Sequence, residues 1–595
     1  MKKLYIAALA FTLILFSCNK DFLDVKPLDK YSDAGVFNDA ALTEAFVNNL
    51  YTRIHHGFKL VMLSSITDES MDVWQWETQA IVQSLINDSY LGMFDPDFMT
   101  SYSAFDWGNI YKSIRYCNIG IERLQDTEIE AKERDRLLGE IHFLRAWFYH
   151  HLVGFYGGVP IIDKSLSPGD DMDLERNSYE DCINFILSDC DMAASLLSSV
   201  DDKARASEGA ALSLKSRVTL WAASDLFHSS AEWSNGYSKP ELIGYVGANR
   251  QQLWQQAKDA ALAVIELGEF SLNNPNPANQ EEAIENLQNM FLNYGTNEGI
   301  FYTYRDYITF NDPDINSSAW EHLDPGKFNG PNGFHNWGGN TPLGQLVDAF
   351  ENADGTEFKW IDSPGFDPYA NRDPRFYSTI LYEGASWRQR PDDVSSIDPE
   401  GKVQVAYYEQ EDGTWTPGLD TRDAPIEDWN GTYTGYYMRK FIDPAIDHQF
   451  EVQDYPWRQF RYAEILLNYA EACIELGEDQ EARNYINMIR KRAAMPEIES
   501  SVSGNDLKEA YRHERHIELA YEQSRYFDVR RWMIAPDVMN QNAKGVEIRF
   551  HYGDPNPEFT HIEVQDRAWD NKMYFKPITL EELNRAGSLV QNPGY

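Results

Sequence analysis

Residues 457–532 decide the fold; they contain WRQFRYAEILLNYAEACIELGEDQEARNYINMIRKRAAM and, after a polar linker, YRHERHIELAYEQSRYFDVRRW. Apolar side chains in residues 462–476 recur every three or four positions, the spacing that places them on one face of an α-helix. Gly477 ends this pattern, which resumes in residues 482–493. Two antiparallel helices are therefore predicted. Such a pair is typical of a tetratricopeptide-like array, in which neighbouring pairs must stack, so more pairs are expected.

Four stretches, in this order along the chain, resemble the SusD-like family, also called SusD/RagB. They are EIHFLRAWFYHHLVGFYGGVPII (140–162), RYAEILLNYAEACIELG (461–477), ERHIELAYEQSRYFDVRRW (514–532) and the terminal KPITLEELNRAGSLVQNPGY (576–595). The resemblance implies a surface lipoprotein of Gram-negative outer membranes. It also implies that this lipoprotein captures glycans for a TonB-dependent transporter of the SusC type.

The helical spacing recurs elsewhere and predicts a mainly α fold: four tetratricopeptide-like helix pairs that form a curved scaffold. The remaining helical patterns lie near residues 38–54, 107–121, 128–153, 179–197, 208–227 and 253–267. Residues 270–455 are rich in Asn, Asp, Gly, Pro and aromatic residues, which predicts a large loop-rich elaboration with a few short strands. Two strand pairs are expected there, from GIFYTYRDY (299–307) and GTYTGYYMRKF (431–441). Residues 38–595 are thus expected to form one domain, with its scaffold in 38–267 and 456–595 and an insertion at 270–455.

The N-terminus has the pattern of an exported lipoprotein. Lys2 and Lys3 precede an apolar run at 4–16, which has the size of a signal-peptide core. Leu-Phe-Ser-Cys then resembles a lipobox, in which Cys18 is acylated. We therefore predict a signal peptide in residues 1–17, a lipidated tether in residues 18–37 and an outer-membrane location. The sequence after Cys18 loosely resembles a cell-surface export signal, and a periplasm-facing orientation is the alternative.

The charge balance is strongly acidic, with 94 Asp and Glu against 52 Lys and Arg, a net charge of −42. Nucleic acid and anionic membrane surfaces both require a positive face, so neither is expected as a partner. Neutral or cationic partners fit better. The alternative is that the acidic residues only keep a secreted protein soluble.

Four cysteines other than Cys18 lie in helical patterns without CxxC spacing, which predicts small buried apolar side chains: Cys117, Cys182, Cys190 and Cys473.

No sequence motif indicates an enzyme or a bound cofactor. HERH (513–516) places two histidines three apart where a zincin needs four, so a salt-bridged helix surface is expected. No phosphate-binding loop or nucleophile elbow occurs, and no carboxylate pair is singled out for glycoside hydrolysis. DPDIN, from Asp312 to Asn316, has oxygen-bearing side chains at alternate positions. This pattern resembles part of a calcium loop, so a structural calcium ion is an alternative.

The last long helical stretch carries many charges among apolar residues: Glu514, Glu518, Arg525, Asp528, Arg530 and Arg531. Burying any of these groups requires a partner. An internal ion-pair network that ties this stretch to Glu464 and Glu471 is therefore predicted.

Two tryptophans stand out in an irregular segment of residues 57–101. Trp74 and Trp76 are two residues apart, close to Asp68 and Asp72. Sugar rings have flat apolar faces edged by hydroxyls, so a glycan site needs aromatic platforms beside hydrogen-bonding side chains. We predict that these four residues contact a glycan.

A second group of candidate ligand-binding residues lies in the loop-rich insertion. Trp320 and Trp337 stand in polar loops, and Asn336 precedes the latter. The resemblance implies that glycan platforms come from these two regions. Packing that anchors the loops is the alternative for each tryptophan.

These observations predict a non-catalytic, carbohydrate-binding lipoprotein that captures an oligosaccharide or polysaccharide. Delivery to a SusC-like TonB-dependent transporter is implied by the resemblance alone. Two alternatives remain open: a tetratricopeptide-type adaptor that binds protein, and a lipid-anchored glycoside hydrolase.

Overall fold

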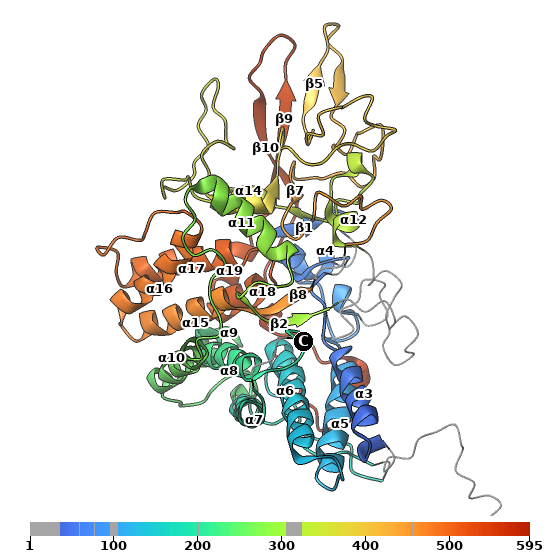
Figure 1. Ribbon diagram of the computed structural model, residues 1–595, viewed down its shortest axis with the longest axis vertical. Coiled ribbons are helices and arrows are strands. Elements are labelled where there is room, and N and C mark those ends of the chain that lie inside the picture. Colours follow the sequence, from blue (N-terminus) through green and yellow to red (C-terminus); the bar gives the residue numbers. More distant parts are fainter. Residues whose placement is uncertain are drawn as a thin grey trace, which may run out of the picture.

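The computed structural model describes residues 36–58, 60–75, 78–95, 105–167, 169–198, 202–304, 324–453 and 456–595. Over these residues the fold is mainly α with a few short strands, as predicted (Figure 1). A row of helices forms the scaffold, each in contact with the next: α5 (Trp107–Leu124), α6 (Ala131–Tyr156), α7 (Tyr179–Leu196), α8 (Glu208–Ala223), α10 (Arg250–Glu266), α15 (Tyr462–Glu475), α16 (Asp479–Arg492) and α17 (Asn505–Glu518). α3 (Ala40–Tyr51) packs beside α5 and α6.

The predicted pair of residues 462–493 is α15 and α16. Every residue of α15 except Glu475 is buried, because α8, α10, α16 and α17 all contact it. Gly477, with φ +79°, makes the turn between the two helices. The pair thus sits inside the stack, as a repeat unit that cannot bury its faces alone requires.

The predicted end of the helix near residue 153 is also confirmed. α6 ends at Tyr156, and Gly157 follows with φ +77°. A Cβ atom at Gly157 would lie 2.4 Å from the carbonyl oxygen of Leu242. Only glycine fits this turn, which brings the chain back along α6.

The loop-rich elaboration occupies the upper half of Figure 1. Short two-stranded ladders join segments that are distant in sequence: β1 (Ser70–Asp72) with β3 (Asn340–Pro342), β2 (Gly299–Thr303) with β8 (Trp457–Arg461), and β4 (Ile380–Leu381) with β7 (Tyr437–Met438). A four-stranded sheet has the order β10 (Glu558–Gln565), β9 (Ala543–Phe550), β5 (Tyr407–Glu409), β6 (Trp415–Pro417). Short helices fill the space between them: α4 (Thr78–Val82), α12 (Pro325–Asn329), α13 (Gly344–Ala349) and α14 (Pro374–Thr379).

Two details of the sequence prediction are wrong, and one hairpin is missing from it. The strands at residues 299–303 and 437–438 pair with β8 and β4, not within their own segments. A full helix, α11 (Gln280–Leu292), lies inside the supposed irregular region. The β9–β10 hairpin, which the sequence analysis does not predict, follows α18 (Ser524–Arg531) and α19 (Ala535–Met539).

Cys117, Cys182, Cys190 and Cys473 are free and buried, which confirms the prediction of apolar packing. Among the described helices, none combines the length and the apolar character needed to cross a membrane.

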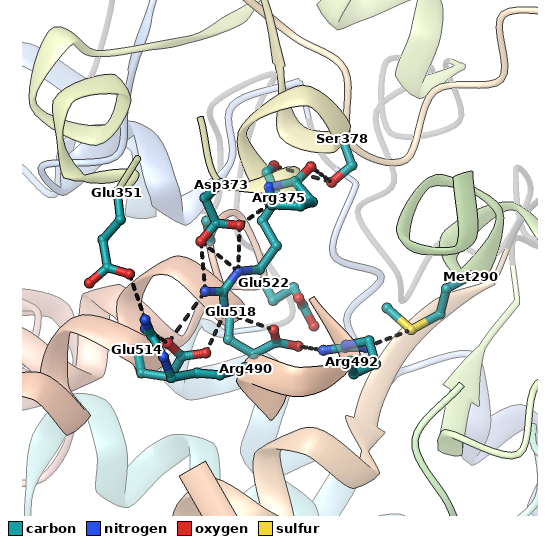
Figure 2. A network of polar contacts seen from close by, with 12 residues as sticks. Met290, Glu351, Asp373, Arg375, Ser378, Arg490, Arg492, Glu514, Glu518 and Glu522 are labelled. Atoms are coloured by element: carbon teal, nitrogen blue, oxygen red, sulfur yellow. Dashed lines mark hydrogen bonds and ion pairs between the residues drawn. The ribbon is translucent and has the colours of Figure 1, made fainter. Parts of the chain in front are cut away.

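A buried network of ions fastens α17 to its neighbours (Figure 2). The Glu514 carboxylate accepts from Arg375 of α14 at 2.5 Å and from Arg490 of α16 at 2.9 Å. Arg375 also holds Asp373 at 2.8 Å, and Arg490 reaches Glu351. Burial raises the pKa of Glu514, but the two guanidinium groups outweigh this effect and lower it.

Glu518, one helical turn further on, binds Arg461 of β8 at 2.7 Å and Arg492 of α16. Both arginines also bind Glu298, which precedes β2, at 2.9 and 3.1 Å. All four groups are almost completely buried. The network therefore links the helical scaffold to the strands of the elaboration through paired charges.

The network predicted from the sequence is correct for Glu471 and wrong for Glu464. Glu471 binds Arg531 at 2.6 Å. Burial raises the pKa of Glu471, but the Arg531 guanidinium outweighs this effect, and the pKa is lowered to about 2. Glu464 instead binds Arg217 of α8 at 2.7 Å. The HERH stretch is not helix surface as predicted: its residues 514–516 are buried.

Glu69, directly before β1, is a buried carboxylate of a different kind. It is 1% exposed, and neither of its oxygens has a hydrogen-bond partner among the described residues. His516 Nε2 lies 4.0 Å away, beyond hydrogen-bonding distance. Burial and the adjacent charge of Asp68 raise the pKa of Glu69 to about 8.

The first prediction concerns the network of α17. Glu518→Gln should lower the free energy of unfolding by about 3–5 kcal/mol, because the buried guanidinium groups of Arg461 and Arg492 lose one of the two carboxylates that they share. Denaturant unfolding followed by circular dichroism measures this. Glu509→Gln removes an exposed carboxylate of the same helix, paired with Arg512, and should change the value by less than about 0.5 kcal/mol. Equal effects of the two substitutions would contradict the assignment.

The second prediction concerns pH. Because the folded-state pKa of Glu69 is raised, its contribution to stability is fully present below about pH 4.5 and is lost as pH rises toward 8. The stability of Glu69→Gln relative to the parent should therefore increase by roughly 3 kcal/mol between pH 4.5 and pH 7. Denaturant unfolding at a series of pH values tests it. Glu411→Gln, in the exposed β5–β6 turn, controls for the loss of a charge; parallel pH profiles for parent and Glu69→Gln would refute the prediction.

Candidate functional site

The pairing of β1 with β3 brings two of the predicted tryptophans together. Asp72 lies opposite Asn340 in the ladder, and the N–H of Val73 donates to the carbonyl of Gly339 at 2.9 Å. The residues that follow β1 must therefore run beside those that precede β3. This places Trp74 next to Trp337, with ring centroids 6.3 Å apart and the planes at 87°.

Two hydrogen bonds, one from the backbone and one from the indole, hold Trp74 in place. The backbone N–H of Trp74 donates to Asp72 Oδ1 at 3.1 Å, and its Nε1 donates to Asn430 Oδ1 at 3.4 Å. Asn430 is fully buried and donates from Nδ2 to Glu427 at 2.9 Å. A third loop is thereby fastened beside the two tryptophans.

That third loop presents Trp429, whose side chain is 56% exposed. Its ring lies 6.2 Å from Trp337, with the planes at 47°. Trp337 is supported from behind by Phe328, 5.2 Å away at a steep angle. Trp74, Trp337 and Trp429 thus form a continuous set of indole rings from three loops, here called the Trp cluster.

Polar side chains surround the Trp cluster. His335 has a left-handed backbone, with φ +58°, and its Nε2 lies 3.0 Å from Asp393 while its Nδ1 lies 3.5 Å from Glu427. Lys327 Nζ donates to the carbonyl of His335 at 2.5 Å and lies 5.8 Å from the Trp337 ring centroid. Burial lowers the pKa of Lys327, against the opposing effect of Glu427. Both signs of charge are therefore present beside an apolar surface.

The other predicted residues of this region lie behind the surface. Asp68 is buried and accepts from Arg525 of α18 at 2.8 and 2.7 Å; burial raises its pKa, but Arg525 brings it well below its usual range. Asp72 is fully buried. Asn336 is 1% exposed, packed against Gly330. None of these three side chains therefore faces solvent, and Asp68 and Asp72 support the loops through their hydrogen bonds.

Several predicted positions lie outside the residues that the structure describes. They are the ligand-binding candidates Trp76 and Trp320, the acylation site Cys18, and the calcium-loop candidates Asp312 and Asn316. Within the described residues, no three His, Cys, Asp or Glu side chains gather as metal ligands do.

The sequence analysis missed Trp429. The signal was available, since Trp429 stands in DWNG (428–431), an indole between an acid and an amide in a polar loop. Trp337 was singled out from a similar setting, in HNWGG (335–339). No periodicity connects residues 74, 337 and 429, so only the tertiary structure reveals that they meet.

This arrangement suits adhesion to a flat, neutral molecule. The exposed ring of Trp429 offers an apolar face and packs at a tilt against Trp337, which in turn meets Trp74 edge-on. Carboxylates, an imidazole and an ammonium group lie at its edge and can exchange hydrogen bonds with hydroxyl groups.

Comparison with known proteins gives the family. A family model described as "SusD family" matches residues 292–595, and one described as "Starch-binding associating with outer membrane" matches residues 21–220. The SusD-like protein P38 of Formosa agariphila is 24% identical over 478 residues, which cover 78% of this chain and 77% of that protein.

Solved structures agree with these matches. A SusD-like protein from Bacteroides fragilis is 28% identical, with a TM-score of 0.73 over 96% of this chain and 100% of that chain. A SusD-like carbohydrate binding protein, also from Bacteroides fragilis, shares the fold at 22% identity, with a TM-score of 0.67 over 93% of this chain and 100% of that chain. With a family model matched over more than half of its length, this chain belongs to the SusD family.

Proposed function

We propose that the Trp cluster is the platform on which this protein captures an oligosaccharide or polysaccharide. The observation that carries the proposal is the exposed indole of Trp429, backed by Trp337 and Trp74 from two other loops. A tryptophan left 56% in water is costly unless it serves a contact. Its planar face matches the C–H face of a sugar ring.

The family relationship supports the same ligand class. One relative of the same fold is described as a carbohydrate binding protein, and the model that matches residues 21–220 is described as starch-binding. The acidic charge of the chain, −42, also favours a neutral ligand over nucleic acid or another polyanion. The glycan is bound without chemical change in this proposal.

The proposal extends to the place of action. Cys18 carries lipid that tethers the protein to the outer membrane, facing the cell surface, and the captured glycan passes to a SusC-like TonB-dependent transporter. The lipobox-like sequence supports the anchor, and the family description supports association with the outer membrane.

Of the two rival functions, a protein-binding adaptor predicts that the loop tryptophans are packing residues. The exposure of Trp429 disfavours that alternative. A glycoside hydrolase would release reducing ends from a polysaccharide, and incubation of the purified protein with bound glycans tests for that release.

The third prediction tests the platform. In calorimetry against a panel of neutral polysaccharides, Trp429→Ala should weaken binding about 10- to 100-fold, because one large apolar contact worth about 1.5–3 kcal/mol is removed. Its thermal midpoint should stay close to that of the parent, since the ring is exposed. Trp415→Ala, on β6 beside His551, is the matched control and should bind as the parent does. Unchanged affinity of Trp429→Ala would remove the site assignment.

The fourth prediction tests the anchor. Cys18→Ala should abolish metabolic labelling with palmitate and shift the protein from the membrane fraction to the soluble fraction, because a single soluble body then lacks its acyl chains. Ser17→Ala keeps the acylated residue and serves as the control. Continued palmitate labelling of Cys18→Ala would contradict the lipid assignment.

A further inference from the structure

A second hollow, separate from the Trp cluster, lies where α11 joins the scaffold. It has a volume of about 630 Å³ and is lined by residues 271–275, which lead from α10 to α11, and 293–297, which lead from α11 to β2. We call it the α11 groove. Its volume is within the range of small-molecule binding sites.

The α11 groove is uncharged. None of its ten lining residues is Asp, Glu, Lys or Arg, although such residues make up 25% of the chain. Its lining consists of amides, hydroxyls, small residues and one aromatic ring. An anionic ligand would find no counter-ion among these lining residues, whereas a neutral polar ligand would find hydrogen-bonding partners.

An aromatic pair stands at one side of the groove. Tyr294, in its lining, and Tyr304, just after β2, are 41% and 40% exposed. Their rings are stacked, with centroids 5.8 Å apart and planes at 13°. Two parallel, half-exposed rings offer an apolar plate, the feature that a sugar ring requires.

Three asparagines of the groove are held by their side-chain nitrogens, and among the described residues their side-chain oxygens accept no hydrogen bond. The amide nitrogens of Asn273, Asn274 and Asn293 donate to Asn286 Oδ1, Glu282 Oε1 and the carbonyl of Asn289 at 2.6, 2.9 and 2.8 Å. Within the described part of the chain, no hydrogen bond reaches the Oδ1 atoms of these asparagines. They are therefore pre-oriented acceptors for donors such as sugar hydroxyls.

The groove is also firmly built. The backbone N–H of Asn273 donates to Glu298 at 2.8 Å, and Glu298 belongs to the buried ion network. The N–H of Ser271 donates to the carbonyl of Asn297 at 3.3 Å, which joins the two walls. The Oγ1 atom of Thr296 is buried without a hydrogen-bond partner in the described residues.

We propose that the α11 groove is a second carbohydrate-binding site, which takes a neutral oligosaccharide against the Tyr294–Tyr304 pair. It shares the ligand class of the proposed function but none of its residues. Hydroxyls of the sugar donate to Asn273, Asn274 and Asn293, and one sugar face rests on the tyrosine plate.

Hydrogen exchange measured by mass spectrometry tests the proposal directly. The probes are neutral oligosaccharides of glucose, xylose, mannose and galactose, six to eight units long, at millimolar concentration. At least one should slow exchange of the backbone amides in residues 271–297 of the parent by about threefold or more, and should do the same in Trp429→Ala. The double substitution Tyr294→Ala, Tyr304→Ala should abolish this protection, and Tyr294→Phe, which keeps the ring, should retain it.

Tyr552→Ala removes a tyrosine that is 60% exposed on the β9–β10 turn, and should leave the protection unchanged. Thermal unfolding confirms that each variant is folded. The second site is overturned if no probe protects residues 271–297, or if the double tyrosine variant is protected as the parent is. Protection of the groove in both proteins, with weakened polysaccharide binding at the Trp cluster of Trp429→Ala, supports both sites. Protection of the groove with no effect of Trp429→Ala on polysaccharide affinity supports this site and refutes the first.

Discussion

The structure depends on the compensation of buried carboxylates along α17. Two buried glutamates, Glu514 and Glu518, would each cost several kcal/mol if left without partners. Each is satisfied by arginines from other elements, α14, α16 and β8. An ion pair of this kind contributes little net stability compared with apolar packing, yet it permits few alternative arrangements. The scaffold and the elaboration are consequently held in one relative placement.

Both proposed binding surfaces are held in place by buried ion pairs. At one end, Arg525 of α18 holds Asp68, just before β1, the strand that Trp74 follows. At the other end, Glu298 binds Arg461 and Arg492 and also receives the backbone N–H of Asn273 at the groove. Loops that carry recognition residues must be stiff if binding is not to require ordering them. Here buried charges and short ladders provide that stiffness, and Trp429 lies exposed at the surface.

The two proposed surfaces both combine aromatic rings with polar groups, but they differ in the size of the rings and in the charge of the polar groups. The Trp cluster offers large rings with charged groups at the edge, and the α11 groove offers smaller rings with uncharged amides. Both are compatible with a hydroxyl-rich neutral molecule and neither with a polyanion, in a chain whose net charge is −42. The net charge of the chain thus disfavours anionic ligands, and the aromatic and polar side chains of each surface favour a hydroxyl-rich one among the neutral ligands.

The sequence by itself determined the helices of the scaffold and the turns at Gly157 and Gly477, because these depend on contacts between residues close in the chain. Its motifs also indicated the family. Helical spacing and glycine stops are local signals. It also indicated that loop tryptophans were of interest. It could not show that Trp74, Trp337 and Trp429 meet, that Asp68 turns inward to Arg525, or that β2 pairs with β8 across more than 150 residues. Those outcomes were decided by strand register and buried charge pairing, which join distant segments and leave no periodic trace in the sequence.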